Sequence, residues 1–281
     1  MQYCLHMKSE NNRVDIVSVV AFLAMATILS ALWGYFASSH GMLNSPRTAG
    51  LAAWLAQTTV FIAATITMLA RSRAAFRRVG WQLGSFKAYT AVFAVTLGVV
   101  ALALGLADLM GGLRYAPQVT ASQVVVTVPI LLISSCLFAF AEEFGWRGFL
   151  LPQLKPLGVR RALLVSGVCW FLWELPLVVF GLLDATLIQI NLPMTLVLHF
   201  LQTLSVGVAF GYLRLRFGSI WLATFAHGLL NTLGAFAFFY FVEENPFIGD
   251  FAGYIGTSLL MVLAGLLLVA SRRLEERTQT S

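Results

Sequence analysis

Two adjacent carboxylates and an arginine end one apolar stretch of this sequence. They are Glu142, Glu143 and Arg147, in the segment AEEFGWRGFL. Residues four apart share one face of a helix, so the guanidinium of Arg147 can hold one carboxylate. The other carboxylate then stays free to act as a base or a metal ligand. The alternative interpretation is a charge-paired helix end at a membrane surface.

Further polar residues lie inside other apolar stretches. His227 and Asn231 are also four apart and share a helix face, while Glu174 stands alone in CWFLWELPL. A lone acid among apolar residues must be protonated, paired or bound to a cation, so Glu174 is the residue hardest to explain as structure. His199 reads as a hydrogen-bonding core residue. If these residues converge, they fit a metal-activated water or a general-base site.

The elements that must position these residues are membrane-spanning helices. The chain is 59% hydrophobic and 11% charged, whereas about a quarter of the residues in soluble domains are charged. Its apolar residues fall into blocks of about 20, the length of helix that crosses a bilayer. The sequence therefore predicts an all-α, polytopic membrane helix bundle. The eight expected transmembrane helices are Val14 to Phe36, Ala49 to Ala70, Ala88 to Gly112, Val124 to Trp146, Ala162 to Leu183, Ile190 to Leu213, Ile220 to Val242 and Tyr254 to Ala270.

The loop charges predict the orientation of this bundle. An even number of spans puts both termini on one side, and positively charged loops stay in the cytoplasm. With cytoplasmic N- and C-termini, all of the 18 Lys and Arg residues except Arg47 and Arg114 lie inside. We therefore expect a multi-pass protein of the cell (cytoplasmic) membrane. The pI of about 9.5 reflects juxtamembrane loops that meet anionic lipid, and it does not indicate a nucleic-acid partner.

The chain is expected to form a single membrane domain. Residues 14–270 contain no linker rich in Pro, Gly or Ser, and residues 1–13 and 271–281 are expected to be cytoplasmic ends. We see no internal duplication of the kind that marks many transporters. This argues against a carrier that uses the buried acids as proton sites.

The residues from about 124 to 234 resemble the CPBP family of intramembrane endopeptidases, also called the Abi or CAAX protease family. Glu142, Glu143 and Arg147 match its Glu-Glu-x3-Arg motif, and His227 with Asn231 matches its His-x3-Asn motif. The resemblance implies that a first-motif glutamate activates the attacking water. It also implies that histidines bind a metal or polarise the water, and that the Asn contributes to an oxyanion site.

The middle motif of the family is altered in this chain. The family usually has an aromatic residue followed four positions later by His, whereas Trp170 here leads to Glu174. Glutamate is an accepted zinc ligand, so Glu174, His227 and Glu142 are the predicted ligands of zinc or another divalent metal. Such a site would be more anionic than one with two histidines. Whether the chain is active therefore depends on Glu174.

Three functions stay open at this point. The leading hypothesis is an intramembrane (metallo)endopeptidase that cleaves a membrane-associated peptide, prenylated or bacteriocin-like, with Glu142 activating a metal-assisted water. Glu143 and Arg147 would form the supporting pair, and Asn231 would donate to the oxyanion. The second is a non-catalytic relative that binds peptides or acts as an immunity or scaffold protein, which the missing middle histidine favours. The third is an ion-coupled transporter.

Overall fold

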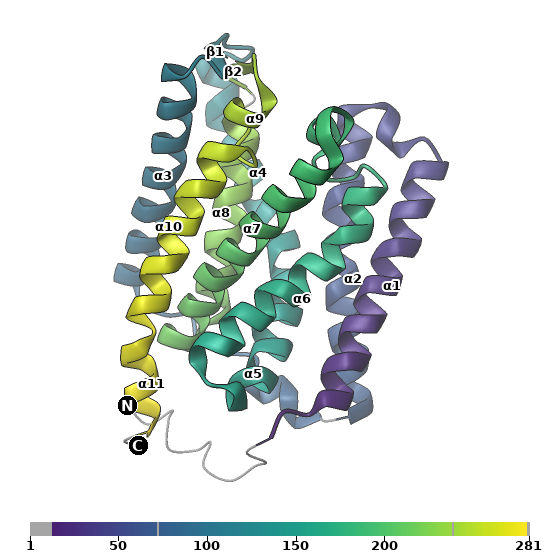
Figure 1. Cartoon of the computed structure of the whole chain (residues 1–281), viewed down its shortest axis with the longest axis vertical. Helices are drawn as coiled ribbons and strands as arrows, with labels where there is room; N and C mark the ends of the chain where they lie inside the picture. Colours follow the sequence, from purple (N-terminus) through teal and green to yellow (C-terminus); the bar gives the residue numbers. More distant parts are fainter. Residues whose placement is uncertain (1–12, 72, 238, 280–281) are drawn as a thin grey trace.

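The computed structural model describes residues 13–71, 73–237 and 239–279, and within them it is a helical bundle (Figure 1). These residues contain eight helices that are long and apolar enough to cross a membrane, which confirms the predicted fold class. The long helices are α1 (Ile16–Ser39), α2 (Pro46–Arg71), α3 (Phe86–Leu109), α4 (Ala121–Glu143), α6 (Val159–Val179), α7 (Ala185–Phe217), α8 (Ile220–Ala237) and α10 (Tyr254–Ala270).

Short elements close the two ends of the bundle. At one end, strand β1 (Leu113–Tyr115) pairs antiparallel with β2 (Phe241–Glu243), next to α9 (Pro246–Gly249). The other end carries α1's first residues and helix α11 (Arg272–Gln279), so the described chain starts and finishes at the same end (Figure 1). The remaining short helices are η2 (Met42–Asn44), η3 (Arg73–Arg78), α5 (Leu151–Leu154) and η5 (Lys155–Leu157). The predicted cytoplasmic segment 1–13 lies outside the described residues except for Arg13.

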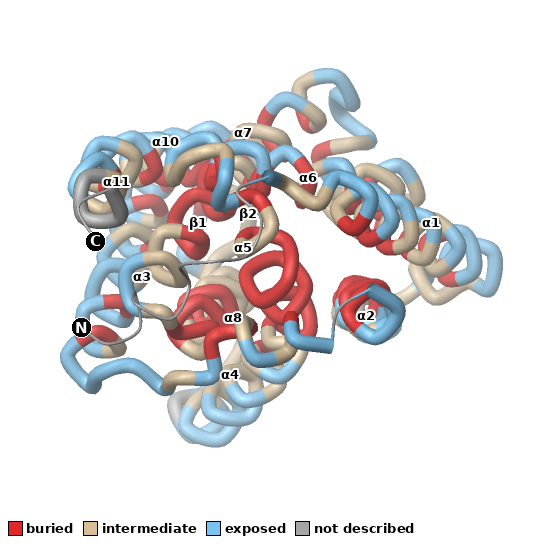
Figure 2. The backbone as a smooth tube through the Cα atoms, turned by 90° about the horizontal axis from the view of Figure 1, so that it is seen from below, coloured by how far each residue is buried: buried red, intermediate tan, exposed pale blue. Residues whose placement is uncertain are grey.

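The bundle has apolar side chains on its outer surface as well as in its core. Val125 and Ile133, on the outward face of α4, are 73% and 71% exposed, as expected for side chains that face lipid. Viewed from below, buried residues gather around α5, α8 and the inward face of α2 (Figure 2). Residues 141–151, at the end of α4 and directly after it, are all buried, so the paired glutamates lie in the core.

Small residues let the inner helices approach closely. A Cβ atom added to Gly207 in α7 would lie 2.9 Å from the Cα of Gly167 in α6. A Cβ on Gly228 in α8 would lie 2.8 Å from the backbone N and Cα of Cys136 in α4. Glycines at helix crossings allow this packing between membrane helices. The α6–α7 and α4–α8 pairs are thus held at the short separations that bring their polar residues together.

Two spans differ in form from the expected straight helices. The fourth span, predicted from Val124 to Trp146, is an α-helix only as far as Glu143 and continues as the π-helix η4 (Phe144–Leu150). The sixth, predicted from Ile190, starts earlier at Ala185 but is broken at Asn191, whose φ of −158° and ψ of 90° are not helical. Asn191 then restarts the helix, because its side-chain oxygen accepts the N–H of Met194 at 3.1 Å.

Candidate active site

The paired carboxylates lie where α4 passes into the π-helix. Glu142 is 2% exposed, and Glu143 and Arg147 are fully buried. This burial argues against the alternative of a charge-paired helix end at a membrane surface. Gly145 lies within the π-helix against Val60 of α2, so closely that a Cβ atom would overlap the valine side chain. A π-helical turn is wider than an α-helical turn and is frequent at functional sites.

Arg147 is enclosed by groups from three helices. Its Nη1 donates to Glu143 Oε1 at 2.9 Å, and its Nη2 donates to the carbonyl oxygen of Gly207 at 3.4 Å. The guanidinium carbon lies 4.3 Å from the ring centre of Trp170 and 5.4 Å from that of Phe210. A cation without contact to water needs these partners, because desolvation of an unpaired charge is very costly. Arg147 is therefore a fixed counter-charge within the bundle.

His227 is held by the same glutamate. Its Nδ1 lies 3.0 Å from Glu143 Oε1, and its ring stands 5.3 Å from the rings of both Trp170 and Phe210. An ionised carboxylate only accepts hydrogen bonds, so Nδ1 is the donor in this pair. A neutral imidazole with a protonated Nδ1 keeps its lone pair on Nε2. Glu143 thus fixes both the ring orientation and the tautomer of His227.

Glu142 differs from its neighbour because it lacks a comparable partner. Its buried Oε2 accepts no hydrogen bond from the described residues. The indole of Trp146 is close enough to interact with the carboxylate, although its N–H is not aligned for a hydrogen bond. Asn231 is half-buried on α8, one helical turn beyond His227. Oε2 of Glu143 is also buried without a partner, but Oε1 of Glu143 is held by Arg147 and His227. Glu142 is thus the carboxylate of the pair that makes no hydrogen bond or ion pair with the described residues.

Glu174 lies beside this group but contacts a different set of residues. Its Oε2 accepts the hydroxyl of Thr203 at 2.9 Å and lies 3.1 Å from Nε2 of His199. Nδ1 of His199 in turn lies 2.6 Å from Oδ2 of Asp184. The ring N–H groups are not aligned along either contact, so both are ion pairs by distance. Glu174 also interacts electrostatically with Arg147 and Glu142.

The predicted metal ligands do not form one donor set. Among the described residues, no group of three or more His, Cys, Asp and Glu side chains is placed to hold a metal ion. Glu174 is occupied by His199 and Thr203, and Nδ1 of His227 is occupied by Glu143. The residues therefore do not fit the three-ligand site proposed from the sequence. Zinc or another divalent metal stays a prediction, and no step below uses it.

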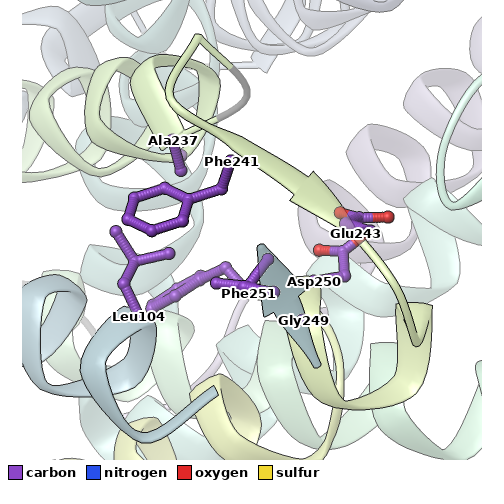
Figure 3. A pocket seen from close by; sticks show the side chains of 9 residues that line it. Leu104, Ala237, Phe241, Glu243, Gly249, Asp250 and Phe251 are labelled. Atoms are coloured by element: carbon purple, nitrogen blue, oxygen red, sulfur yellow. The ribbon is translucent and has the colours of Figure 1, made fainter. Parts of the chain in front are cut away.

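A cavity lies away from this site, at the end of the bundle that carries β1 and β2. It has a volume of about 70 Å³, and Phe241 and Phe251 line it together with Glu243 and Asp250 (Figure 3). Burial, and next the charge of Asp250, raise the pKa of Glu243 to about 7. Glu243 is the last residue of strand β2, and its side chain is half-buried.

Several contributors to the site could not be found from the sequence. Phe210 and the carbonyl of Gly207 complete the enclosure of Arg147, yet neither is a recognisable motif residue. His199 was predicted to be a hydrogen-bonding core residue, and it is buried between Glu174 and Asp184. No feature of the sequence points to Asp184. No spacing connects Asp184 to His199, because their contact depends on the break at Asn191.

One comparison with known proteins finds a family that matches part of the chain. Residues 124–233 match the family described as "Type II CAAX prenyl endopeptidase Rce1-like". The match covers most of α4 and α8 and all of the π-helix, α6 and α7, so it includes every charged and polar residue of the site above. It also agrees with the segment of about 124–234 that carried the resemblance. No curated protein gives a significant match to the chain.

Proposed function

Because this chain carries an Rce1-like type II CAAX prenyl endopeptidase family domain over residues 124–233, we propose that it is an intramembrane endopeptidase. Its substrate would be a membrane-associated peptide or protein, of the prenylated or bacteriocin-like kind, presented from the cytoplasmic side of the cell membrane. The observation that carries the proposal is the division of labour between two adjacent buried glutamates. Glu143 is held through Oε1 by Arg147 and His227, whereas Glu142 makes no hydrogen bond or ion pair with the described residues, although Oε2 of both acids lacks a partner.

In this proposal Glu142 is the general base. Its carboxylate takes a proton from a water molecule between it and His227, and the resulting hydroxide attacks the carbonyl carbon of the scissile peptide bond. The protonated Glu142 then gives that proton to the leaving amine nitrogen, and the products are a carboxylic acid and an amine. Burial supports this role, because a base in a water-poor site acts without competition from bulk solvent.

Glu143 and Arg147 are assigned to the positioning of His227. Nδ1 of His227 donates to Glu143, so Nε2 is free to accept a hydrogen bond from the attacking water. Arg147 compensates the negative charge that Glu142 and Glu143 would otherwise share. Asn231, on the same face of α8, is assigned to donate its amide N–H to the oxyanion of the tetrahedral intermediate.

Cleavage of a reporter peptide tests this assignment. Purified protein in proteoliposomes should cleave a membrane-anchored peptide, and Glu142→Gln should lower kcat by a factor of about 100 or more with an unchanged fold. Glu244→Gln is the matched control, since this exposed acid is paired with Arg114 at the far end of the bundle. Full cleavage by the Glu142→Gln variant would end the proposal. Peptide binding without cleavage by the natural protein would favour a peptide-binding relative instead.

A further inference from the structure

Asp184, His199 and Glu174 form an ion-pair chain that the proposed mechanism does not use. The Glu174 carboxylate lies 3.1 Å from Nε2 of His199, and the Asp184 carboxylate lies 2.6 Å from Nδ1. The side chains of both acids are 14% exposed and that of His199 is 7% exposed. Neither ring N–H is aligned for a hydrogen bond, but two carboxylates this close to one ring stabilise its positively charged imidazolium form. His199 is therefore a buried cation between two anions.

The backbone is distorted in a way that makes this contact. His199 follows Asp184 by 15 positions, and a straight helix would separate them by about 22 Å. The break at Asn191 instead folds residues 184–190 back toward the later part of α7. Without that break, Asp184 would lie several turns away from His199.

Asp184 also departs from the usual role of its position. It is the N-cap of α7, where an Asp side chain normally accepts a hydrogen bond from the first turn, yet it makes no such bond. Its φ of 51° is the one positive φ of a non-glycine residue in the described part of the chain. Left-handed backbone in such a residue is costly and is retained where the surrounding structure requires it. Here the carboxylate is directed to His199 instead of the helix end.

Glu174 connects the Asp184–His199–Glu174 ion pairs to the proposed catalytic residues. The Glu174 carboxylate interacts electrostatically with both Glu142 and Arg147. An uncompensated anion at this point would compete with Glu143 for Arg147 and would repel Glu142. The hydroxyl of Thr203 fixes the same Glu174 oxygen that faces His199, so the carboxylate is both neutralised and oriented.

We propose that His199 is a positioning residue, a built-in cation that Asp184 holds against Glu174 so that Glu174 leaves the Glu142–Glu143–Arg147 group undisturbed. The inference rests on the proposed endopeptidase function for its kinetic test, although the ion-pair chain can be tested without activity. In this proposal His199 supplies the positive charge beside Glu174 that the sequence analysis assigned to a metal ion.

Chemical rescue distinguishes this charge from simple packing. His199→Gly should lower kcat for the reporter peptide by about 10- to 100-fold, because misplacement of neighbouring charges disturbs the reacting geometry. Added imidazole should restore part of the lost kcat with saturation. Furan, which has a similar shape but no charge, should not. Restoration by both compounds, or by neither, would overturn the inference.

A melting experiment provides a readout that does not require cleavage. Imidazole should raise the melting temperature of the His199→Gly protein in detergent, and furan should raise it less. If the natural protein cleaves nothing, the proposed function fails. The melting measurement still shows whether His199 acts as a cation between Asp184 and Glu174. Equal increases in melting temperature with the two compounds would overturn the inference that His199 acts through its charge.

Two further variants separate the loss of the His199 charge from the effects of an empty site or of any substitution on α7. His199→Gln fills the site without a charge, so it should lose kcat and show no response to imidazole; kcat within twofold of the natural protein would also overturn the inference. If His199→Gly does not fold, the kcat of His199→Gln alone decides whether the inference stands. Ser205→Ala is the matched control on α7, because its buried hydroxyl bonds to the carbonyl of Leu201 in its own helix.

Discussion

Replacement of Arg147 by Met should destabilise the protein far more than the loss of one surface ion pair. The Arg147 and Glu143 side chains are both 0% exposed, and their nitrogen and oxygen lie 2.9 Å apart. Removal of one partner leaves the other as an uncompensated buried charge, at a cost of about 3–5 kcal/mol. Met has a comparable apolar length, so most of that cost reflects the charge of Glu143 and the lost contacts with Trp170 and Phe210.

The assay is equilibrium unfolding in mixed micelles at increasing mole fractions of a denaturing detergent. The double variant Glu143→Gln, Arg147→Met should be more stable than Arg147→Met alone, because it leaves a neutral amide in place of a buried anion and reduces the loss to about 1–3 kcal/mol. Cleavage should be lost in both variants, because each disturbs the group that orients His227.

Arg114→Met is the matched control for this experiment. Arg114 and Glu244 are closer together, at 2.6 Å, but their side chains are 60% and 48% exposed. An exposed pair contributes at most about 1 kcal/mol whatever its length. An Arg147→Met protein within 1 kcal/mol of the natural protein, or a double variant less stable than the single, would refute the reasoning from burial.

Three other results are expected. Gly228→Ala should lower stability by about 1–3 kcal/mol and lower kcat, since its Cβ would meet the backbone of Cys136 beside His227. Gly234→Ala on the same helix has open space and should be neutral, so equal unfolding midpoints for the two variants would contradict this account. The pKa of Glu243 is raised from 4.5 to about 7 by burial, so the stability it contributes is fully present below about pH 4.5 and is lost as the pH rises through 7. Unfolding measured from pH 4 to 8 should show this decline, and a Glu243→Gln protein that keeps it would assign the decline to another group. Glu174→Ala should leave the metal content of the purified protein unchanged, because Glu174 contacts His199 and not His227; elemental analysis that finds one equivalent of metal lost on substitution would restore Glu174 as a ligand.

The sequence by itself was sufficient to predict that this protein lies in a membrane and to find the main catalytic candidates. Blocks of about 20 apolar residues are sufficient to predict eight spans, because backbone groups in lipid must be hydrogen-bonded within helices. The spacing of Glu143 and Arg147, four apart, likewise predicts their ion pair, since helix geometry alone brings such residues together. Most bounds of the long helices were predicted to within four residues, but α7 starts five residues before Ile190 and α8 ends five residues before Val242, which lies in strand β2.

Only the tertiary structure decided which polar groups from different helices meet. His227 and Glu143 are 84 residues apart in sequence, and their contact depends on glycine-mediated approach of α8 to α4. Glu174 was predicted to share a metal ion with His227, but it contacts His199 on the neighbouring helix α7. The break at Asn191 then brings Asp184 to the other nitrogen of His199. Helix periodicity fixes the neighbours of a residue on its own helix, whereas contacts between helices depend on rotation, crossing and kinks. These are set by packing of the whole bundle, which no local spacing in the sequence specifies.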